Sequence, residues 1–164
     1  MNIYTAYIAV GSNLGDKLSN CQKGISELTK KTNSQLIRLS DFYQTQPMYI
    51  EDQDWFINGV FSIQTKYSPH ELFHSIKETE ILLGRDLTAK RYGPRVLDLD
   101  ILMMDNLIIN TQNLNIPHPR LHERRFVLQP LSDIAAEIVH PILNKNIKEL
   151  LIDLNDDQKV YRYK

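Results

Sequence analysis

Hydrophobic and polar positions along the chain follow two periods, which predict strands in alternation with helices. Apolar runs that are continuous or alternate with polar residues predict strands over Tyr7 to Val10, Gln35 to Tyr43, Phe56 to Lys66 and Val96 to Met104. Apolar residues at three- and four-residue spacing predict one helix through Leu18, Cys21, Ile25 and Leu28, and a second from Pro69 to about Gly84. The order β-α-β-β-α-β favours an α+β ferredoxin-like sandwich, a mainly antiparallel sheet covered by helices on one face.

The pattern is weaker after the last of these strands. It predicts a short strand over Leu107 to Ile109, a helix over Phe126 to Val139 that Pro130 interrupts, and a final helix over Asn146 to Ile152. Three polar or basic stretches follow neither period and are expected to be loops: QTQPMYIEDQD, LTAKRYGPR and NIPHPRLHERR.

Length and composition narrow the class of protein. A chain of 164 residues with 42% hydrophobic residues is typical of one globular domain, which we expect to span residues 1–164. The net charge of −1 argues against bulk electrostatic binding of nucleic acid or of an anionic membrane. Cys21 is the single cysteine, so no internal disulfide is possible, and its place on a helical stripe predicts a core residue. Because the sequence shows neither a membrane span nor a signal peptide, we expect a cytoplasmic protein.

The stretch RYGPRVLDLDILMMD places two carboxylates inside an apolar strand. Side chains alternate along a strand, so every second residue from Leu97 to Met103 is expected to face the core, and Asp98 and Asp100 the other side. The carboxylates would lie about 7 Å apart at their Cα atoms and would repel each other unless a cation joined them. Mg²⁺ suits such a pair, because it commonly takes one or two carboxylates with phosphate oxygens and water. A D-x-D pair taken alone is more often merely solvated.

Arginines gather around this strand. Six of the eight arginines lie between positions 85 and 125: Arg85, Arg91, Arg95, Arg120, Arg124 and Arg125. Guanidinium groups suit bidentate contact with phosphate, so the two basic loops could close over a polyphosphate and its metal. Glu80 lies inside the apolar stripe of its helix and needs a partner, either a ligand or a nearby arginine. His118 is on an exposed loop between two prolines and could donate to phosphate or ribose.

A phosphoryl acceptor would also need a site. Asn58 shares a face of its predicted strand with Phe56, and its amide offers a donor and an acceptor to the edge of a flat heterocycle. Phe56, Tyr92 and Phe126 could stack on such a ring, although each aromatic taken singly is more often a core residue. Residue spacing leaves the identity of the heterocycle open.

The motifs taken together resemble a known family. AYIAVGSNLGDK, FYQTQP, NGV, GR, RYGPRVLDLDIL and PHPRLHERRFVLQPL, in this order over about Ala6 to Pro141, resemble the 6-hydroxymethyl-7,8-dihydropterin pyrophosphokinases of folate biosynthesis. GPR-x-LDLDIL together with PHPR-x-x-x-R is highly specific, and GSNLG alone is weaker. The resemblance implies a ferredoxin-like α+β fold and a diphosphokinase that moves pyrophosphate from ATP to the hydroxymethyl group of a reduced pterin, releasing AMP. It implies two Mg²⁺ ions and these two small molecules as partners.

The resemblance also assigns roles residue by residue. The metal-binding pair falls on Asp98 and Asp100, and the phosphate-contacting arginines fall on Arg85 and Arg95; these four are the implied catalytic residues. The other implied ATP contacts are Lys77, Glu80, Ile101, His118 and Arg124. The implied pterin pocket comprises Thr45, Met48, Phe56, Asn58, Tyr92 and Phe126.

Five positions depart from the family pattern. Leu87 stands where many members carry a second loop arginine, which leaves the loop's share of catalysis open. Gln46 replaces a frequent proline, and Lys77 occupies a position that is often Gln. Tyr92 stands where Trp is common and Phe56 where Tyr can occur, and both keep an aromatic ring. The last twenty residues carry no signature of the family. We expect a monomer, but the sequence leaves a dimer open as well.

Two other classes of function remain as alternatives. A nucleotidyltransferase also combines a Gly-Ser turn with a D-x-D strand, but normally as close neighbours in sequence, whereas Gly11 and Asp98 lie far apart along this chain. A ferredoxin-like domain that senses a small molecule needs neither a metal pair nor an arginine cluster. Consumption of ATP with and without a reduced hydroxymethylpterin would separate the three.

Overall fold

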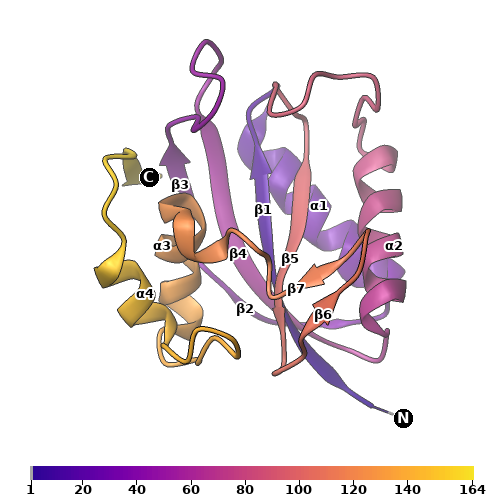
Figure 1. Cartoon of the computed structure of the whole chain (residues 1–164). Coiled ribbons are helices and arrows are strands. Elements are labelled where there is room, and N and C mark those ends of the chain that lie inside the picture. Colours follow the sequence, from indigo (N-terminus) through magenta and orange to yellow (C-terminus); the bar gives the residue numbers. More distant parts are fainter. Residues whose placement is uncertain (1) are drawn as a thin grey trace.

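The computed structural model describes residues 2–164, and Figure 1 shows the order of its elements. These are β1 (Tyr4–Ser12), α1 (Lys17–Lys31), β2 (Gln35–Leu39), β3 (Tyr43–Thr45), β4 (Phe56–Thr65), α2 (Pro69–Leu82), β5 (Asp98–Met104), β6 (Ile109–Asn110), β7 (Asn115–Ile116), a 3₁₀ turn (Leu121–Glu123), α3 (Arg125–Ala135), α4 (Ile147–Asp153) and β8 (Val160–Arg162). The main sheet has the order β5-β1-β4-β3-β8, and β2 pairs with β4 in line with β3. All its pairs are antiparallel, which confirms the predicted α+β class.

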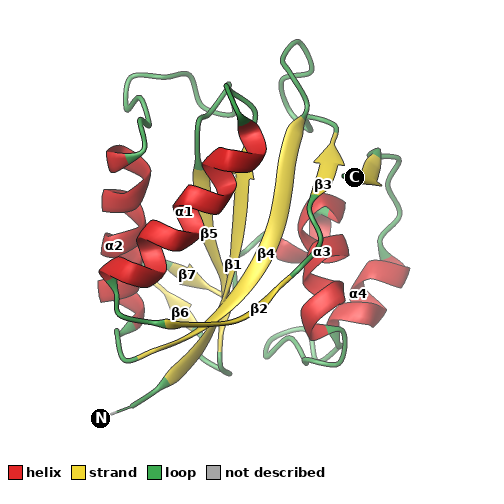
Figure 2. Ribbon diagram, turned by 180° about the vertical axis from the view of Figure 1, so that it is seen from behind, coloured by secondary structure: helices red, strands yellow, loops and turns green. Residues whose placement is uncertain are grey.

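Helices cover both faces of this sheet, so the expectation of a single covered face is wrong. Figure 2 shows α1 crossing one face, which it shares with α2, while α3 and α4 lie against the other. In β1, Ala6, Ile8 and Val10 belong to the core under α1 and α2, whereas Tyr7 and Ala9 pack against the core under α3 and α4. A continuous apolar run is typical of a strand that is buried on both faces, and β1 is such a strand.

The first helix follows its predicted stripe. Cys21, Ile25 and Leu28 are buried against the sheet. Burial of each of the two large aliphatic side chains, Ile25 and Leu28, contributes roughly 1.5–3 kcal/mol to the stability of the fold. Asp16 caps the helix by accepting a hydrogen bond from the backbone N–H of Ser19. The second helix begins at Pro69 as predicted, behind a capping box formed by Ser68 and Glu71.

A β-bulge changes the predicted facing of β5. Ile8 of β1 pairs with Ile101, but Tyr7 pairs with Met103, so β5 has one extra residue at Leu102. Leu97, Leu99 and Ile101 face α1 and α2 as expected. Beyond the bulge the alternation is reversed: Met104 continues that face, and Met103 joins the core under α3. The prediction that Met103 shares a face with Leu97 is therefore wrong, while the facing of Asp98 and Asp100 lies before the bulge and is unaffected.

Other boundaries differ from the pattern in smaller ways. The strand predicted over Gln35 to Tyr43 is divided into β2 and β3 at Ser40, whose Oγ accepts from the N–H of Val60 at 2.9 Å. Pro130 lies inside α3 without ending it, and the helix stops at Ala135. The strand expected over Leu107 to Ile109 is only the pair Ile109–Asn110, and β8 was not predicted. Among residues 2–164 we find no helix with the length and apolar character of a membrane span.

Candidate active site

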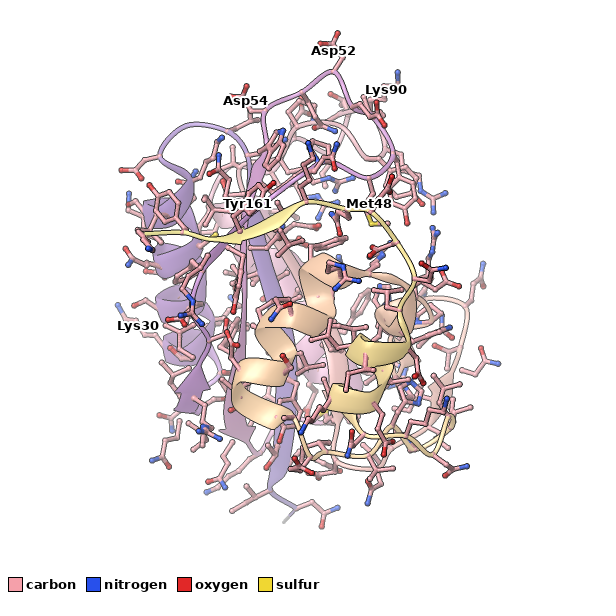
Figure 3. All side chains as sticks on the ribbon, turned by 90° about the vertical axis from the view of Figure 1, so that its left-hand side faces the viewer. Lys30, Met48, Asp52, Asp54, Lys90 and Tyr161 are labelled. Carbon is pink, nitrogen blue, oxygen red and sulfur yellow. The ribbon has the colours of Figure 1, made fainter. Side chains whose placement is uncertain are left out.

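A cavity of about 390 Å³ lies at the end of the sheet where β4 and β5 begin. The β3–β4 loop (residues 46–55) and the α2–β5 loop (residues 83–97) both lie at this end of the sheet in Figure 1, and Figure 3 shows Asp52 and Lys90 of these loops there. A third wall comes from residues 118–126. All predicted site residues except Glu80 and Ile101 line the cavity: Thr45, Met48, Phe56, Asn58, Lys77, Arg85, Tyr92, Arg95, Asp98, Asp100, His118, Arg124 and Phe126.

Asp98 and Asp100 both face this cavity from β5, where they pair with Gly11 and Ala9 of β1. The pKa of Asp98 is raised to about 6, mainly by burial and also by the charge of Asp100, while Arg85 opposes the rise. Burial raises the pKa of Asp100 as well, against the effect of Lys77. The Asp98 side chain is still 38% exposed, and this part faces the cavity, so a ligand can reach it. A divalent cation would stabilise both carboxylates in their charged forms.

The donor set fits a magnesium ion that is shared with a ligand. Within residues 2–164, no three His, Cys, Asp or Glu side chains gather as a metal site. Asp98 and Asp100 would therefore leave most coordination positions to phosphate oxygens and water, as Mg²⁺ prefers. A structural zinc site would need three or four protein ligands, including His or Cys.

Glu80 is the most deeply buried acid of the site, with an exposed fraction of 0%. Its Oε2 accepts from Arg85 Nη1 at 2.6 Å and from the backbone N–H of Leu99 at 3.0 Å, and its Oε1 accepts from Lys77 Nζ at 3.1 Å. Burial raises the pKa of Glu80, while Lys77 and Arg85 lower it. The sequence left either a ligand or a nearby arginine as the partner of Glu80, and the structure confirms the arginine, Arg85. Glu80 does not line the cavity, so its contact with a nucleotide stays a prediction.

The two predicted phosphate-binding arginines are held in different ways. Arg85 spans two acids, because its Nη1 also lies 3.4 Å from Asp98 Oδ1. Arg95 is fixed through its backbone: its N–H donates to Asn13 Oδ1 at 2.7 Å, and its carbonyl accepts from the N–H of Asn13 at 3.0 Å. The Arg95 side chain therefore extends into the cavity from an anchored main chain.

Asn13 and Gln53 fasten the loops together, and the sequence analysis missed both. The buried Asn13 amide donates to Gln53 Oε1 at 2.9 Å and to the carbonyl of Asp54 at 3.0 Å. Gln53 in turn donates to the carbonyl of Tyr92 at 2.9 Å. The β3–β4 loop is thus tied to the α2–β5 loop by side-chain amides. The GSN motif contained a signal for Asn13, whereas Gln53 lies in a polar loop without any period.

Tyr49 is a further unpredicted residue of the cavity wall. Its ring centroid lies 4.2 Å from that of Tyr92, with the planes 30° apart. The guanidinium carbons of Arg120 and Arg124 lie 5.0 Å and 5.9 Å from the same Tyr49 ring. Stacking and cation–π attraction therefore join all three loops at one side chain. Of the six clustered arginines only Arg125 does not line the cavity.

One end of the cavity has the features expected for a flat heterocycle. Phe56 and Phe126 line it with Met48. Asn58 is 8% exposed, and its amide nitrogen donates to Thr45 Oγ1 at 2.6 Å, which fixes the orientation of the amide. Gly11 faces Asn58 across β1 and β4, and a Cβ at this glycine would overlap Asn58 Oδ1. The glycine of the GSN motif therefore makes room for the Asn58 side chain.

A second cavity of about 310 Å³ adjoins the first one and contains Ile101. The two cavities share Lys77, Asp100, His118 and Pro119. Burial lowers the pKa of His118 to about 4, with smaller contributions from Arg124 and Arg120, so the imidazole is neutral at pH 7. Its Nδ1 accepts from the backbone N–H of Arg120 at 3.1 Å, which leaves the proton on Nε2. Leu87, by contrast, is 74% exposed and lines neither cavity.

The chain is similar in sequence to known proteins over most of its length. The family model described as 7,8-dihydro-6-hydroxymethylpterin-pyrophosphokinase (HPPK) matches residues 7–136. The chain is 37% identical over 158 residues to the 2-amino-4-hydroxy-6-hydroxymethyldihydropteridine pyrophosphokinase of Haemophilus influenzae, covering 96% of this chain and 97% of that protein. It is 39% identical over 133 residues to the protein of the same name from Bacillus subtilis, covering 81% of this chain and 79% of that protein.

Longer proteins also contain a similar region. The folic acid synthesis protein fol1 of Schizosaccharomyces pombe is 39% identical over 146 residues, which are 89% of this chain, but the chain spans only 20% of that protein. A crystal structure of Plasmodium falciparum HPPK-DHPS with pteroate matches with a TM-score of 0.77 over 92% of this chain and 42% of that chain, at 17% identity. At this level of identity the structural likeness supports the fold alone.

Proposed function

This chain belongs to the 7,8-dihydro-6-hydroxymethylpterin-pyrophosphokinase family, and on this premise we propose that it transfers pyrophosphate from ATP to the hydroxymethyl group of 6-hydroxymethyl-7,8-dihydropterin in folate biosynthesis. One observation carries the proposal for this chain's own residues. Asp98 and Asp100 lie in a cavity that has an aromatic end with a fixed amide and a second cavity beside it. A pair of acids between two binding regions suits a transfer between two substrates.

The nucleotide is assigned to the side of Ile101 and His118. The adjoining cavity offers the apolar surface of Ile101 for a base, and the neutral His118 offers an Nε2–H donor for ribose or phosphate. Cationic side chains continue from there along the main cavity, so a triphosphate can extend toward the carboxylates. These cations are Lys77, Arg85, Arg95 and Arg124.

The reduced pterin is assigned to the opposite end. Phe56 and Phe126 offer ring faces for stacking, as does Tyr92 of the α2–β5 loop. Because Asn58 already donates one N–H to Thr45, its other N–H and its carbonyl oxygen remain for the edge of the heterocycle. A hydroxymethyl substituent would then point toward Asp98 and Asp100 in the same cavity.

The carboxylate pair is proposed to hold two Mg²⁺ ions with the ATP phosphates. When bound, these ions would supply charge neutralisation and would favour the deprotonated hydroxyl. Asp98 and Asp100 are the residues that would hold them, because both carboxylates face the cavity and burial disfavours their charge in the absence of a cation. We propose ATP as the co-substrate on the same grounds.

The protein's own groups would promote the reaction by position and charge. The substrate hydroxyl attacks the β-phosphorus, the bond from this phosphorus to the oxygen bridging to the α-phosphate breaks, and AMP leaves with the bonding electrons. The hydroxyl proton passes to water or to Asp98. Arg85 and Arg95 offset the negative charge on the transferred group. Glu80 holds Arg85 in place beforehand, so the guanidinium needs little rearrangement.

The two alternative functions are less well supported than the pyrophosphokinase. The distance in sequence between Gly11 and Asp98 was the argument against a nucleotidyltransferase, yet these two residues pair directly across β1 and β5. That argument therefore has no force, and the family match is what favours the pyrophosphokinase. A purely sensing domain would not need six cations around two acids.

Product analysis by phosphorus NMR tests the proposal. Incubation with ATP, Mg²⁺ and the reduced hydroxymethylpterin should yield AMP and a pterin diphosphate ester in equal amounts, and chelation of the metal should stop the reaction. A nucleotidyltransferase would release pyrophosphate, an ordinary kinase would give ADP and a pterin monophosphate, and a sensing domain would leave ATP unconsumed. Any of these three results would contradict the proposal. A sample without pterin serves as the control for ATP hydrolysis.

A further inference from the structure

The segment after α4, residues 154–162, returns to the proposed pterin end of the cavity. It lies beyond residue 136, where the family match ends. In Figure 3 it is the yellow chain that leaves α4, passes the end of α3 and runs on as β8 through Tyr161. β8 pairs with β3, and Val160 lies opposite Thr45. The segment is therefore bound to an element that lines the cavity.

Gln158 of this segment joins two walls of the cavity through one amide group. Its Oε1 accepts from the backbone N–H of Phe126 at 3.2 Å, and its Nε2 donates to the carbonyl of Gln46 at 2.7 Å. Phe126 and Gln46 both line the cavity, whereas Gln158 does not. The N-cap residue of α3, Arg124, makes no capping bond with its side chain, so Gln158 satisfies a donor of this helix end that would otherwise need water.

Gln46 binds the same segment from its own side. Its backbone N–H donates to the carbonyl of Lys159 at 3.0 Å, and its Oε1 accepts from the N–H of Lys159 at 3.2 Å. A proline at position 46 could make neither bond, because it lacks the N–H and the side-chain amide. The glutamine here and the C-terminal segment are thus two parts of one contact.

The first residue of α3 is fastened to the segment as well. Arg125 Nε donates to Asp156 Oδ1 at 2.6 Å, and Arg125 Nη2 donates to the carbonyl of Leu154 at 3.2 Å. This explains why Arg125, alone among the clustered arginines, does not face the cavity. The start of α3, which carries Phe126, therefore has three hydrogen bonds to residues 154–158.

We propose that Gln158 is a positioning residue for the pterin: it sets the spacing between the Thr45–Gln46 wall and the Phe126 wall, between which the heterocycle would bind. The inference rests on the proposed function. Gln158 acts at one end of the cavity only, because none of its bonds reaches the residues around Ile101 and His118. Its loss should weaken the binding of the pterin and leave the binding of the nucleotide unchanged.

Calorimetric titration of the full chain with the reduced hydroxymethylpterin, in the presence of a non-hydrolysable ATP analogue and Mg²⁺, tests this. Gln158→Ala should raise the dissociation constant of the pterin roughly tenfold, the usual effect of losing a hydrogen bond of this kind, and change that of the ATP analogue less than twofold. Gln158→Glu keeps the acceptor for Phe126 but sets an oxygen against the carbonyl of Gln46, so it should also weaken pterin binding and leave the binding of the ATP analogue unchanged. Lys159→Ala is the matched control, because Lys159 makes its bonds to Gln46 through the backbone.

The possible outcomes separate this inference from the proposed function. Selective loss of pterin affinity in both Gln158 variants, with an unchanged control, supports the positioning role. If both variants bound the pterin as tightly as the wild type, or lost both ligands equally together with stability, the positioning role would be wrong and the proposed function would stand. If the wild type bound the ATP analogue but no pterin, the proposed function would fail, and this inference with it.

Discussion

Replacement of Glu80 tests whether the acid behind the cavity acts through its hydrogen bonds. Glu80→Ala removes the nearer of the two acids that contact Arg85 Nη1, removes the acceptor of the buried N–H of Leu99, and leaves a space in the core. Glu80→Gln keeps a carbonyl oxygen that can occupy the place of Oε2 and accept from both. Its amino group would then face Lys77, whose side chain is 41% exposed and can turn toward water.

The expected magnitudes follow from these contacts. Removing one partner of a buried ion pair lowers the free energy of unfolding by about 3–5 kcal/mol. We take this range to include the cost of leaving the N–H of Leu99 without an acceptor. For a chain of this size a loss of about 4 kcal/mol lowers the midpoint of thermal unfolding by roughly 8–16 °C. Glu80→Gln loses only the charge on one side of a bond to Arg85, so we expect a cost of about 1–2 kcal/mol. Lys77 adds little to either value because its side chain is 41% exposed and its ammonium group can remain hydrated.

Urea and thermal unfolding of matched variants provide the assay. Glu78 is the control, since it lies on the same helix and pairs with Lys31 at 2.9 Å, but its side chain is 45% exposed. Glu78→Ala and Glu78→Gln should therefore leave the unfolding midpoint nearly unchanged. The reasoning is refuted if Glu80→Ala is as stable as Glu78→Ala. Equal destabilisation by Gln and Ala at position 80 would show that charge, and not hydrogen bonding, is what Glu80 supplies.

Three further predictions use other parts of the site and core. Asp98→Ala or Asp100→Ala should stay folded, because like charges are relieved, while activity falls by about three orders of magnitude or more; near-normal turnover with Mg²⁺ would refute the metal assignment. Burial raises the pKa of the Cys21 thiol to about 12, so thiol reagents should label it only after denaturation, and rapid labelling of the native protein would be the contrary result. Burial lowers the pKa of His118 to about 4, so between about pH 6.5 and pH 4 the unfolded chain binds a proton at this residue that the folded chain does not. The free energy of unfolding should therefore decrease as the pH falls through that window. NMR titration of the imidazole should give the low value, and an ordinary one near 6.5 would contradict it.

The fold was predictable where the hydrophobic period was regular. The stripe through Cys21 and Ile25 and the alternation from Leu97 to Ile101 both lie as their periods require. The bulge at Leu102 could not be predicted, because a single extra residue depends on the pairing with β1 and leaves no trace in an all-apolar run. The second covered face was a missed inference: Tyr7 and Ala9, apolar neighbours on the other side of β1, already required a partner layer.

The site was predictable where the chemistry needs particular residue types. Paired carboxylates, clustered arginines and a carboxylate on an apolar stripe are unusual enough to stand out from a single sequence. Tyr49, Gln53 and Gln158 do not stand out, since tyrosine and glutamine are ordinary in polar loops. Their roles depend on loop conformations and on contacts between segments far apart in the chain. The residues that build the cavity were harder to recognise than those that are proposed to contact its ligands.

The net charge of the whole chain does not reveal how charge is distributed around the candidate active site. A net charge of −1 gave no reason to expect a polyanionic substrate. Yet six cationic side chains line the main cavity against two carboxylates: Lys77, Arg85, Arg91, Arg95, Arg120 and Arg124 face Asp98 and Asp100. The positive charge is thus concentrated where a triphosphate would bind, and acids elsewhere balance it. Such a cleft attracts an anionic nucleotide at long range without making the whole surface adhere to polyanions. The concentration of charge, and not its total, is the physical property that suits this cavity to the proposed binding of ATP.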